Sequence, residues 1–139
     1  MADFKKLEVF HKSHALALNV IRTSANMRGS VALAIKGQMV RAALSVATNI
    51  VEGSAKGSDR EFARFVKISI GSVSELEYHL MVAADTALLS QQTFERLFDQ
   101  LVDVRKMLTG LLQTLQLSAD RSTLKARRGL AGRTSAGSR

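Results

Sequence analysis

The chain has 139 residues, which suits a single domain with its own core, and it contains no Cys, Pro or Trp. The absence of Cys excludes disulfides, thiol catalysis and Cys-ligated zinc. The absence of Pro, with 46% hydrophobic and only 5% aromatic residues, favours long unbroken helices over a turn-rich β fold. Because no apolar signal segment opens the chain and no apolar run reaches about 18 residues, we expect a cytoplasmic protein without a membrane partner.

The net charge of +8 is unevenly distributed along the chain. Residues 1–119 contain 14 Lys and Arg against 11 Asp and Glu, whereas residues 120–139 contain six against one. The last twenty residues therefore carry +5 of the total. A basic tail on a weakly basic body can bind nucleic acid or another acidic surface by Coulomb attraction, although charge alone is equally compatible with a tail that only keeps the protein soluble.

Hydrophobic periodicity predicts a first helix over about residues 4–27 and a second over about residues 31–52, the second ending at Gly53. In both helices the apolar side chains cover a wider arc than one bundle core needs. Burying the excess between copies of the chain stabilises an assembly by about 25 cal/mol per Å², and closed rings are the usual outcome for identical subunits. The alternative is that these two helices are the most buried ones in a monomer.

The second half of the chain predicts two more helices. Ser58 and Glu61 form a capping box, which predicts the start of a third helix that continues to about residue 89. A fourth helix is predicted over about residues 91–117. Its apolar residues step by three and four along a heptad seam, which is typical of bundle packing: Phe94, Leu97, Leu101, Val104, Leu108, Leu111 and Leu115.

The predicted fold is all-α, an up-down-up-down antiparallel four-helix bundle over residues 1–118. From residue 119 onwards Gly, Ser, Arg and Ala dominate and no apolar period is visible. We therefore expect residues 119–139 to form a disordered basic tail.

No residue pattern points to catalysis. Glu75 and Glu77 point about 160° apart on a helix and cannot share a substrate atom, and Glu75 with His79 is typical of a surface hydrogen bond. Glu8 and His11 supply one Glu-x-x-His motif, whereas a di-iron bundle needs two. The sequence thus predicts a protein that is not an enzyme and holds neither a metal nor a cofactor.

Basic residues gather at two places that could meet phosphates. One cluster surrounds the second loop and the opening of the third helix, and it consists of Lys56, Arg60, Arg64 and Lys67. The other lies in the tail and consists of Arg121, Lys125, Arg127 and Arg128. In a ring these clusters would repeat once per subunit and could follow a phosphate backbone. With one Tyr and no Trp, recognition would be electrostatic and of low sequence specificity, and a solvated helix face is equally compatible with the first cluster.

A row of short polar side chains has no obvious solvent role. The second helix presents Arg41, Ser45, Asn49 and Glu52, and the third offers Ser72 and Glu75. We expect a hydrogen-bonded seam between these helices or with a neighbouring subunit. Within that seam, a half-buried Arg41–Glu52 pair would specify register more than it would add stability.

Three long stretches resemble one known family. They are DFKKLEVF at residues 3–10, QMVRAALSVATNIVEG at residues 38–53, and the segment that runs from EF at 61–62 to GSVSELE at 71–77. These stretches resemble the four-helix-bundle proteins first noted in intervening sequences of bacterial 23S rRNA genes. The resemblance extends over residues 3–117 and implies a bundle that assembles as a ring, with a pentamer expected.

The accessory variability protein of diversity-generating retroelements is a similar relative, and it binds nucleic acid and a reverse transcriptase. The resemblance therefore implies RNA or another nucleic acid, and a reverse transcriptase or other protein, as partners. The leading hypothesis is a ring-forming adaptor for RNA or a ribonucleoprotein. The alternative hypothesis is a protein-interaction scaffold that binds no nucleic acid.

Overall fold

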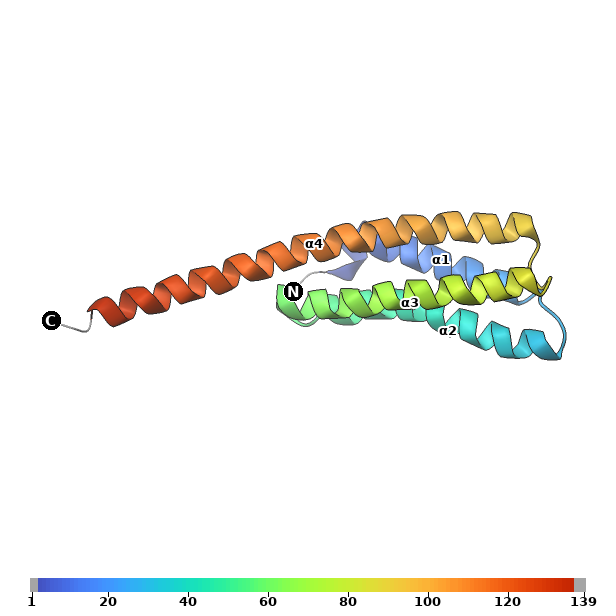
Figure 1. Cartoon of the computed structure of the whole chain (residues 1–139), viewed down its shortest axis with the longest axis horizontal. Helices are drawn as coiled ribbons and strands as arrows, with labels where there is room; N and C mark the ends of the chain where they lie inside the picture. The colour runs from blue at the N-terminus through green and yellow to red at the C-terminus, as the bar shows by residue number, and fades with distance from the viewer. Residues whose placement is uncertain (1–2, 137–139) are drawn as a thin grey trace.

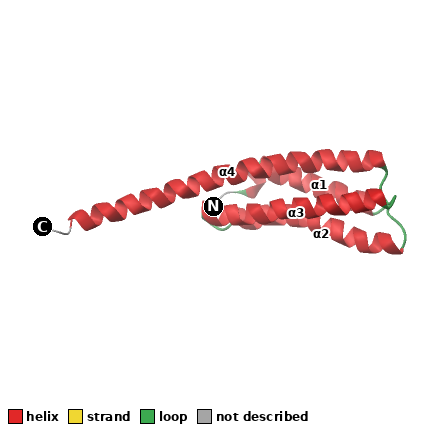
Figure 2. Ribbon diagram, viewed as in Figure 1, coloured by secondary structure: helices red, strands yellow, loops and turns green. Residues whose placement is uncertain are grey.

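The computed structural model describes residues 3–136. This part of the chain is all-helical, with four α-helices and no strands, as the sequence predicts (Figure 2). The elements in chain order are the 3₁₀ turn η1 (Phe4–Lys6), α1 (Glu8–Ser24), α2 (Ser30–Ser54), α3 (Asp59–Asp85) and α4 (Gln91–Ala136). The helices lie side by side, and α2 contacts α1 and α3 while α4 contacts α1 and α3 (Figure 1).

The ends of the helices follow from local hydrogen bonds. The Ser58 side chain accepts a bond of 3.2 Å from the backbone N–H of Glu61, so α3 begins at the predicted cap. The Glu61 carboxylate pairs with Arg64 instead of completing the capping box. At the start of α4, the Ser90 hydroxyl accepts a bond of 3.1 Å from the backbone N–H of Thr93.

The heptad seam of α4 forms one side of the core. Five of its seven residues are buried, and only Phe94 and Leu111 are half-buried. All four helices contribute fully buried side chains to the same cluster. The largest of them are Leu16, Val20, Met39, Val46, Ile50, Val66, Val73, Leu76, Leu80, Leu101, Val104 and Leu108.

Gly53 has a packing role that its expected position at a helix end does not reveal. It lies in the last turn of α2 and is buried. A Cβ added there would lie 2.8 Å from Cβ of Phe65 and 2.9 Å from the ring of Phe62. The first turns of α3 can therefore approach α2 closely only because this residue has no side chain.

The largest departure from the sequence prediction is the tail. Residues 119–136, which we name the arm, continue α4 as a helix that projects well beyond the other helices (Figure 1). The prediction of a disordered segment is wrong for these residues, and the remaining tail residues lie outside the described part. The bundled part of α4 has already nucleated the helix, and Ala, Leu, Arg and Lys favour its propagation. Gly129 and Gly132 weaken the arm, but they do not end it.

The predicted excess of apolar surface is plain on α2 and slight on α1. The side chains of Val31, Leu33 and Leu44 on α2 are 58%, 76% and 45% exposed, whereas Ile21 on α1 is 38% exposed. Within residues 3–136, α2 is also the one helix long and apolar enough to cross a membrane by length and composition. Because α2 buries Met39 in the common core and packs along α3, we regard it as a core helix with one uncovered side.

Candidate nucleic-acid interface

The arm leaves the bundle beside the start of α3, and a groove of about 540 Å³ lies at this junction. Its walls are Arg60, Glu61, Ala63, Arg64 and Lys67 of α3, and Gln116, Ala119 and Asp120 of α4. The hydroxyl of Ser118 donates a hydrogen bond to the Asp59 carboxylate, which ties the root of the arm to the first turn of α3. Three of the four predicted basic residues at this end of the bundle therefore share one groove with the arm's root.

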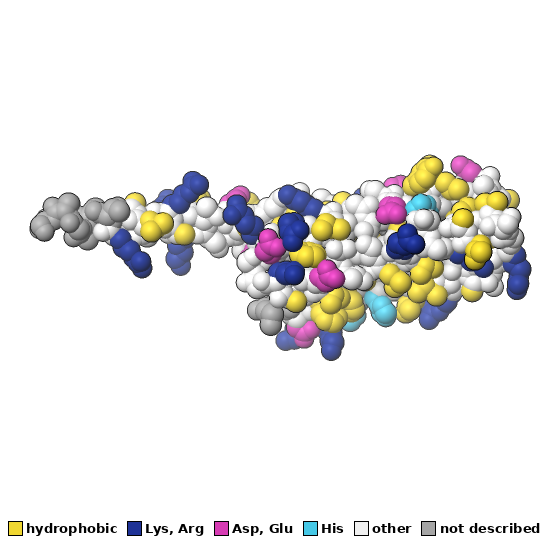
Figure 3. Space-filling model, turned by 90° about the horizontal axis from the view of Figure 1, so that it is seen from below, with side chains coloured by type: hydrophobic (Ala, Val, Ile, Leu, Met, Phe, Trp, Pro, Cys, Tyr) yellow, Lys and Arg dark blue, Asp and Glu magenta, His cyan; other side chains and the backbone are white. Residues whose placement is uncertain are grey.

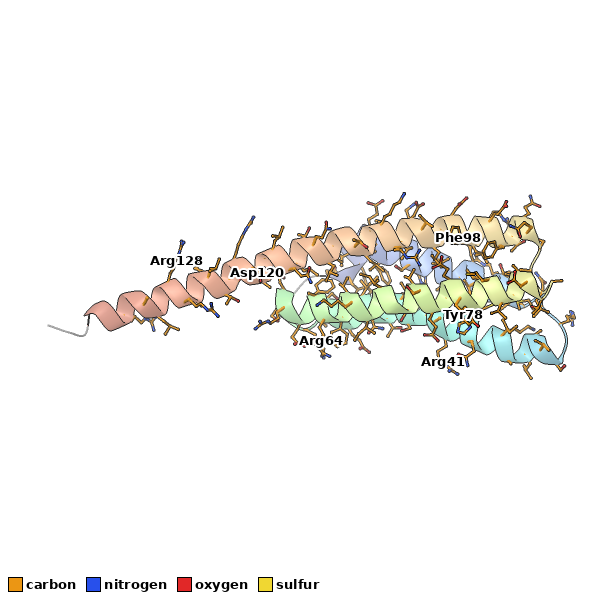
Figure 4. The ribbon with its side chains drawn as sticks, viewed as in Figure 1. Arg41, Arg64, Tyr78, Phe98, Asp120 and Arg128 are labelled. Atoms are coloured by element: carbon orange, nitrogen blue, oxygen red, sulfur yellow. The ribbon has the colours of Figure 1, made fainter. Side chains whose placement is uncertain are left out.

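Two of the cations are held in place by Phe65. The Arg64 guanidinium lies 4.8 Å from the centre of the Phe65 ring, and the Lys56 ammonium lies 5.2 Å from it. Arg64 also donates to the Glu61 carboxylate at 3.2 Å and 3.3 Å. Its side chain remains 60% exposed, so it can still contact a ligand. Figure 4 labels it at the start of α3, at the end of the bundle from which the arm projects.

The other two groove cations have no partner within the described chain. Arg60 and Lys67 are exposed and make neither an ion pair nor a hydrogen bond among residues 3–136. The groove also contains the carboxylates of Glu61 and Asp120, which leave its walls with a net charge of only +1. Its positive potential therefore depends on the cations of the neighbouring arm.

The arm carries the four predicted cations and one more. Arg121, Lys125, Arg127 and Arg128 are all exposed, and no acidic residue follows Asp120 in the sequence. The prediction omitted Arg133, which is exposed on the same helix. At about 100° per residue, these five cations cover about 240° of the circumference. Lys and Arg side chains accordingly project from more than one side of the arm (Figure 3).

The two aromatic side chains in the first turns of α3 are not available for base stacking. Phe62 and Phe65 in the first turns of α3 are only 6% and 9% exposed. The arm has no aromatic residue, and Tyr78, at 62% exposed, belongs to the second half of α3. The arrangement offers charge and shape to a ligand, as the composition predicts.

The predicted polar seam exists at its centre. Asn49 donates to the backbone carbonyl and the hydroxyl of Ser45 at 2.8 Å and 3.1 Å. The hydroxyls of Ser45 and Ser72 share a bond of 2.8 Å, and Ser72 also donates to the Ile68 carbonyl at 3.2 Å. The Ser45–Ser72 bond joins α2 to α3, and the other bonds satisfy groups that the two helices partly bury.

The outer members of the proposed seam are not joined to it. Arg41 and Glu52 are both exposed, and their eleven-residue separation on α2 corresponds to about 16 Å of helix rise. The expected Arg41–Glu52 pair therefore cannot form within one chain. Glu75 instead meets His79 at 3.4 Å, one turn further along α3.

Sequence reasoning missed several polar contacts between helices. Arg105 of α4 and Glu77 of α3 form a half-buried ion pair of 2.6 Å, and buried Ser69 donates to the Val46 carbonyl at 2.7 Å. Both contacts join residues more than 20 positions apart, so helical periodicity cannot reveal them. Within the described residues, no group of three or more His, Cys, Asp and Glu side chains could hold a metal ion.

A second groove lies at the other end of the bundle, between α1 and α4. Its volume is about 490 Å³, and its walls include Arg22, Arg96, Asp99 and Gln100. Asn19 donates to Gln100 across it at 3.1 Å. Its two arginines are exposed and distant in the fold from the arm, so they provide matched controls for charge changes at the junction.

Comparison with known proteins identifies the bundle but not a ligand. The sequence profile of the 23S rRNA-intervening sequence protein family matches residues 5–110. A crystal structure of a protein with unknown function from the S23 ribosomal protein family of Bacteroides thetaiotaomicron VPI-5482 is similar, with a TM-score of 0.68 and 19% identity. The match covers 75% of this chain and 97% of that chain. No curated protein matches.

Proposed function

Because this chain belongs to the 23S rRNA-intervening sequence protein family, we propose that it is a non-enzymatic RNA-binding adaptor that forms a homo-oligomeric ring of up-down-up-down bundles. RNA meets what we name the basic junction, which comprises Lys56, Arg60, Arg64 and Lys67 at the start of α3 and Arg121, Lys125, Arg127, Arg128 and Arg133 on the arm. The observation that carries the proposal is the groove that places three of the α3 cations beside the root of the cationic arm.

The physical basis of the proposal is counterion release. Each Lys or Arg that neutralises a phosphate frees condensed cations, so affinity falls steeply as salt rises. Arg60 and Lys67 have no internal carboxylate to displace, which makes them the α3 groups best placed for this role. The carboxylate of Asp120 repels phosphate at the root of the arm, so the main phosphate contacts lie beyond that residue.

Self-assembly is the second part of the proposal, and a pentameric ring is the expected form. The uncovered side of α2, with Leu33 and Leu44, is an apolar surface that a second copy would remove from water. A Cβ added at Gly37 on the same helix would meet no neighbouring atom within 4 Å, which leaves room for the close approach of another copy. In a ring the basic junction repeats once per subunit and the affinity for a long polyanion rises by multivalency.

The cellular setting of the proposal is the cytoplasm, without a membrane partner. A reverse transcriptase or another protein of a ribonucleoprotein would be the second ligand of the ring. RNA would then connect the ring to that protein, which is what we mean by an adaptor.

Titration of the full-length protein with a structured RNA at two salt concentrations tests the proposal. We expect binding at low salt that weakens at high salt. The double variant Arg60→Gln/Lys67→Gln should reduce the slope of log affinity against log salt by about 1.4–1.8, since each lost phosphate contact contributes about 0.7–0.9. The matched variant Arg22→Gln/Arg96→Gln removes the same charge at the other groove and should leave the slope unchanged. Absence of binding at low salt would overturn the proposal.

A protein-interaction scaffold without nucleic acid is the second candidate function. The exposure of Leu33 at 76% and Tyr78 at 62% favours it, since large exposed apolar side chains are typical of protein contact surfaces. Purification of the complex after nuclease treatment separates the candidates. A scaffold keeps its protein partner, whereas an RNA adaptor loses it.

A further inference from the structure

The distribution of charge around the arm restricts the shape of its ligand. Arg121, Lys125 and Arg128 lie on one side of the helix, whereas Arg127 and Arg133 lie about 100–140° to either side of them. A flat anionic surface touches one side of a helix only. Contact with all five cations therefore requires phosphates on at least two sides of the arm.

The size of the arm agrees with the groove of a double helix. Residues 121–136 of α4 rise by about 24 Å, and a helix with its side chains is about 10–12 Å across. A duplex presents two rows of phosphates, one on each wall of a groove, and the major groove of B-form DNA is about 12 Å wide. The major groove of A-form RNA is deeper and narrower, so the arm would enter it where a loop or bulge widens it.

A single strand fits the junction less well. Proteins that hold single strands combine a basic groove with aromatic side chains that stack on the bases. Here Phe62 and Phe65 are buried and the arm has no aromatic residue. The remaining attraction is Coulombic, and it favours the duplex, which has about twice the charge per unit length of a single strand.

A lipid surface or an apolar partner helix also fits poorly. Leu124 and Leu130 of the arm are 55% and 64% exposed, but they lie about 120° apart on the helix. Arg127 lies midway along the arc that would have to be apolar. An interfacial helix needs one continuous apolar face, and the arm does not have one.

We propose that the basic junction binds the two phosphate rows of a double-helical nucleic acid, with the arm in a groove and Arg60 and Lys67 against the adjoining backbone. This inference rests on the proposed function and specifies its ligand. Recognition follows the shape and charge of the duplex and not its base sequence.

The test uses the full-length protein and three probes of equal length: an RNA hairpin, a DNA duplex and an oligouridine single strand. We expect both helical probes to bind at least tenfold more tightly than the single strand at the same salt concentration. Lys125→Gln and Arg127→Gln alter opposite sides of the arm and should each weaken hairpin binding by about fourfold, the average share of one contact in non-specific binding. Arg22→Gln is the charge-matched control and should leave the affinity unchanged.

The outcomes separate this inference from the proposed function. Equal affinity for the single strand and the hairpin overturns the duplex inference but leaves RNA binding intact, as does a loss confined to one of the two arm variants. Failure of all three probes to bind at low salt overturns the proposed function itself. Both residues are exposed and belong to the arm, and unchanged thermal unfolding of the variants would verify that the bundle is intact.

Discussion

At the residue scale, the close contact at Gly53 shows how one missing side chain determines the position of α3. The Cβ of Phe65 and the ring of Phe62 occupy the space that a side chain would need. Phe65 in turn lies beneath the cations of Lys56 and Arg64. The packing at Gly53 and the arrangement of the basic junction therefore both depend on Phe65.

Replacement of Gly53 by Ala should lower the free energy of unfolding by about 1–3 kcal/mol, because the added methyl group forces α2 and α3 apart. Urea denaturation with a helical signal measures the change. Gly110→Ala is the matched control, since a Cβ there meets nothing within 4 Å, and it should stabilise α4 by up to about 1 kcal/mol. Equal effects of the two substitutions would contradict the packing argument.

Asp120 is the last carboxylate before the arm's cations, and it lies in the groove with Arg60 and Lys67. Asp120→Asn removes a repulsion between protein and phosphate without changing the size of the side chain. We expect the affinity for an RNA hairpin to rise about two- to fivefold at low salt and the gain to shrink at high salt. Fluorescence anisotropy at two salt concentrations measures it, and a fall in affinity would contradict the assignment of this groove to phosphate.

At the element scale, α4 is one helix whose two parts are stabilised differently. Its first part is held by the heptad seam that packs in the core, whereas the arm has no such seam. Short helices without tertiary contacts are marginal in water, and like charges on neighbouring turns weaken them further. The arm is thus the part of the fold whose helicity responds most to a bound polyanion.

Removal of residues 120–139 should leave the unfolding temperature of the bundle nearly unchanged, because the core includes no residue beyond Leu115. The same truncation should lower RNA affinity by at least a hundredfold at low salt, because it deletes all five described arm cations. Differential scanning calorimetry and RNA titration measure the two effects. A large drop in thermal stability would show that the arm packs on the bundle.

Sequence periodicity predicted what depends on neighbouring turns of one helix. The heptad seam, the Ser58 cap and the membership of the family are confirmed. The arm was missed because it has no apolar period, although its residues tolerate a helix. The Glu77–Arg105 pair and the contact at Gly53 were missed because they depend on the packing of separate helices.

The candidate site was predicted in part for the same reason. The spacing of Arg60, Arg64 and Lys67 on one helix face is a local property, and they do share a groove. The same groove also includes Asp120 and the root of the arm. This part of the site depends on how α4 packs against α3. Sequence spacing likewise could not show that Arg41 and Glu52 are too far apart to pair within one chain.

At the scale of the whole molecule, the uncovered side of α2 is the surface that a single chain leaves unsatisfied. Leu33 and Leu44 lie eleven residues apart, which is about three turns of helix, so they share one face of α2. The helix as a whole is apolar enough to resemble a membrane span in composition. In the proposed assembly, contact between copies would remove this face from water without displacing the core contacts of α2.

Leu44→Glu should dissociate the proposed ring, because it introduces a charge into the apolar contact between copies. Light scattering coupled to size exclusion should then report a particle near 15.1 kDa, against about five times that mass for the unaltered protein. Leu124→Glu is the matched control on the arm and should leave the mass unchanged. A stable 15.1 kDa particle for the unaltered protein at micromolar concentration would contradict self-assembly.

The departure of the arm from one end of the bundle has a consequence for any cyclic assembly. Rotation about a single axis keeps corresponding ends of all subunits on the same side. A ring whose axis runs along the bundles would thus have two unlike rims, one carrying the cationic arms and the other without them. Such a particle would bind a polyanion at one rim only, and the opposite rim would remain free to bind another ligand.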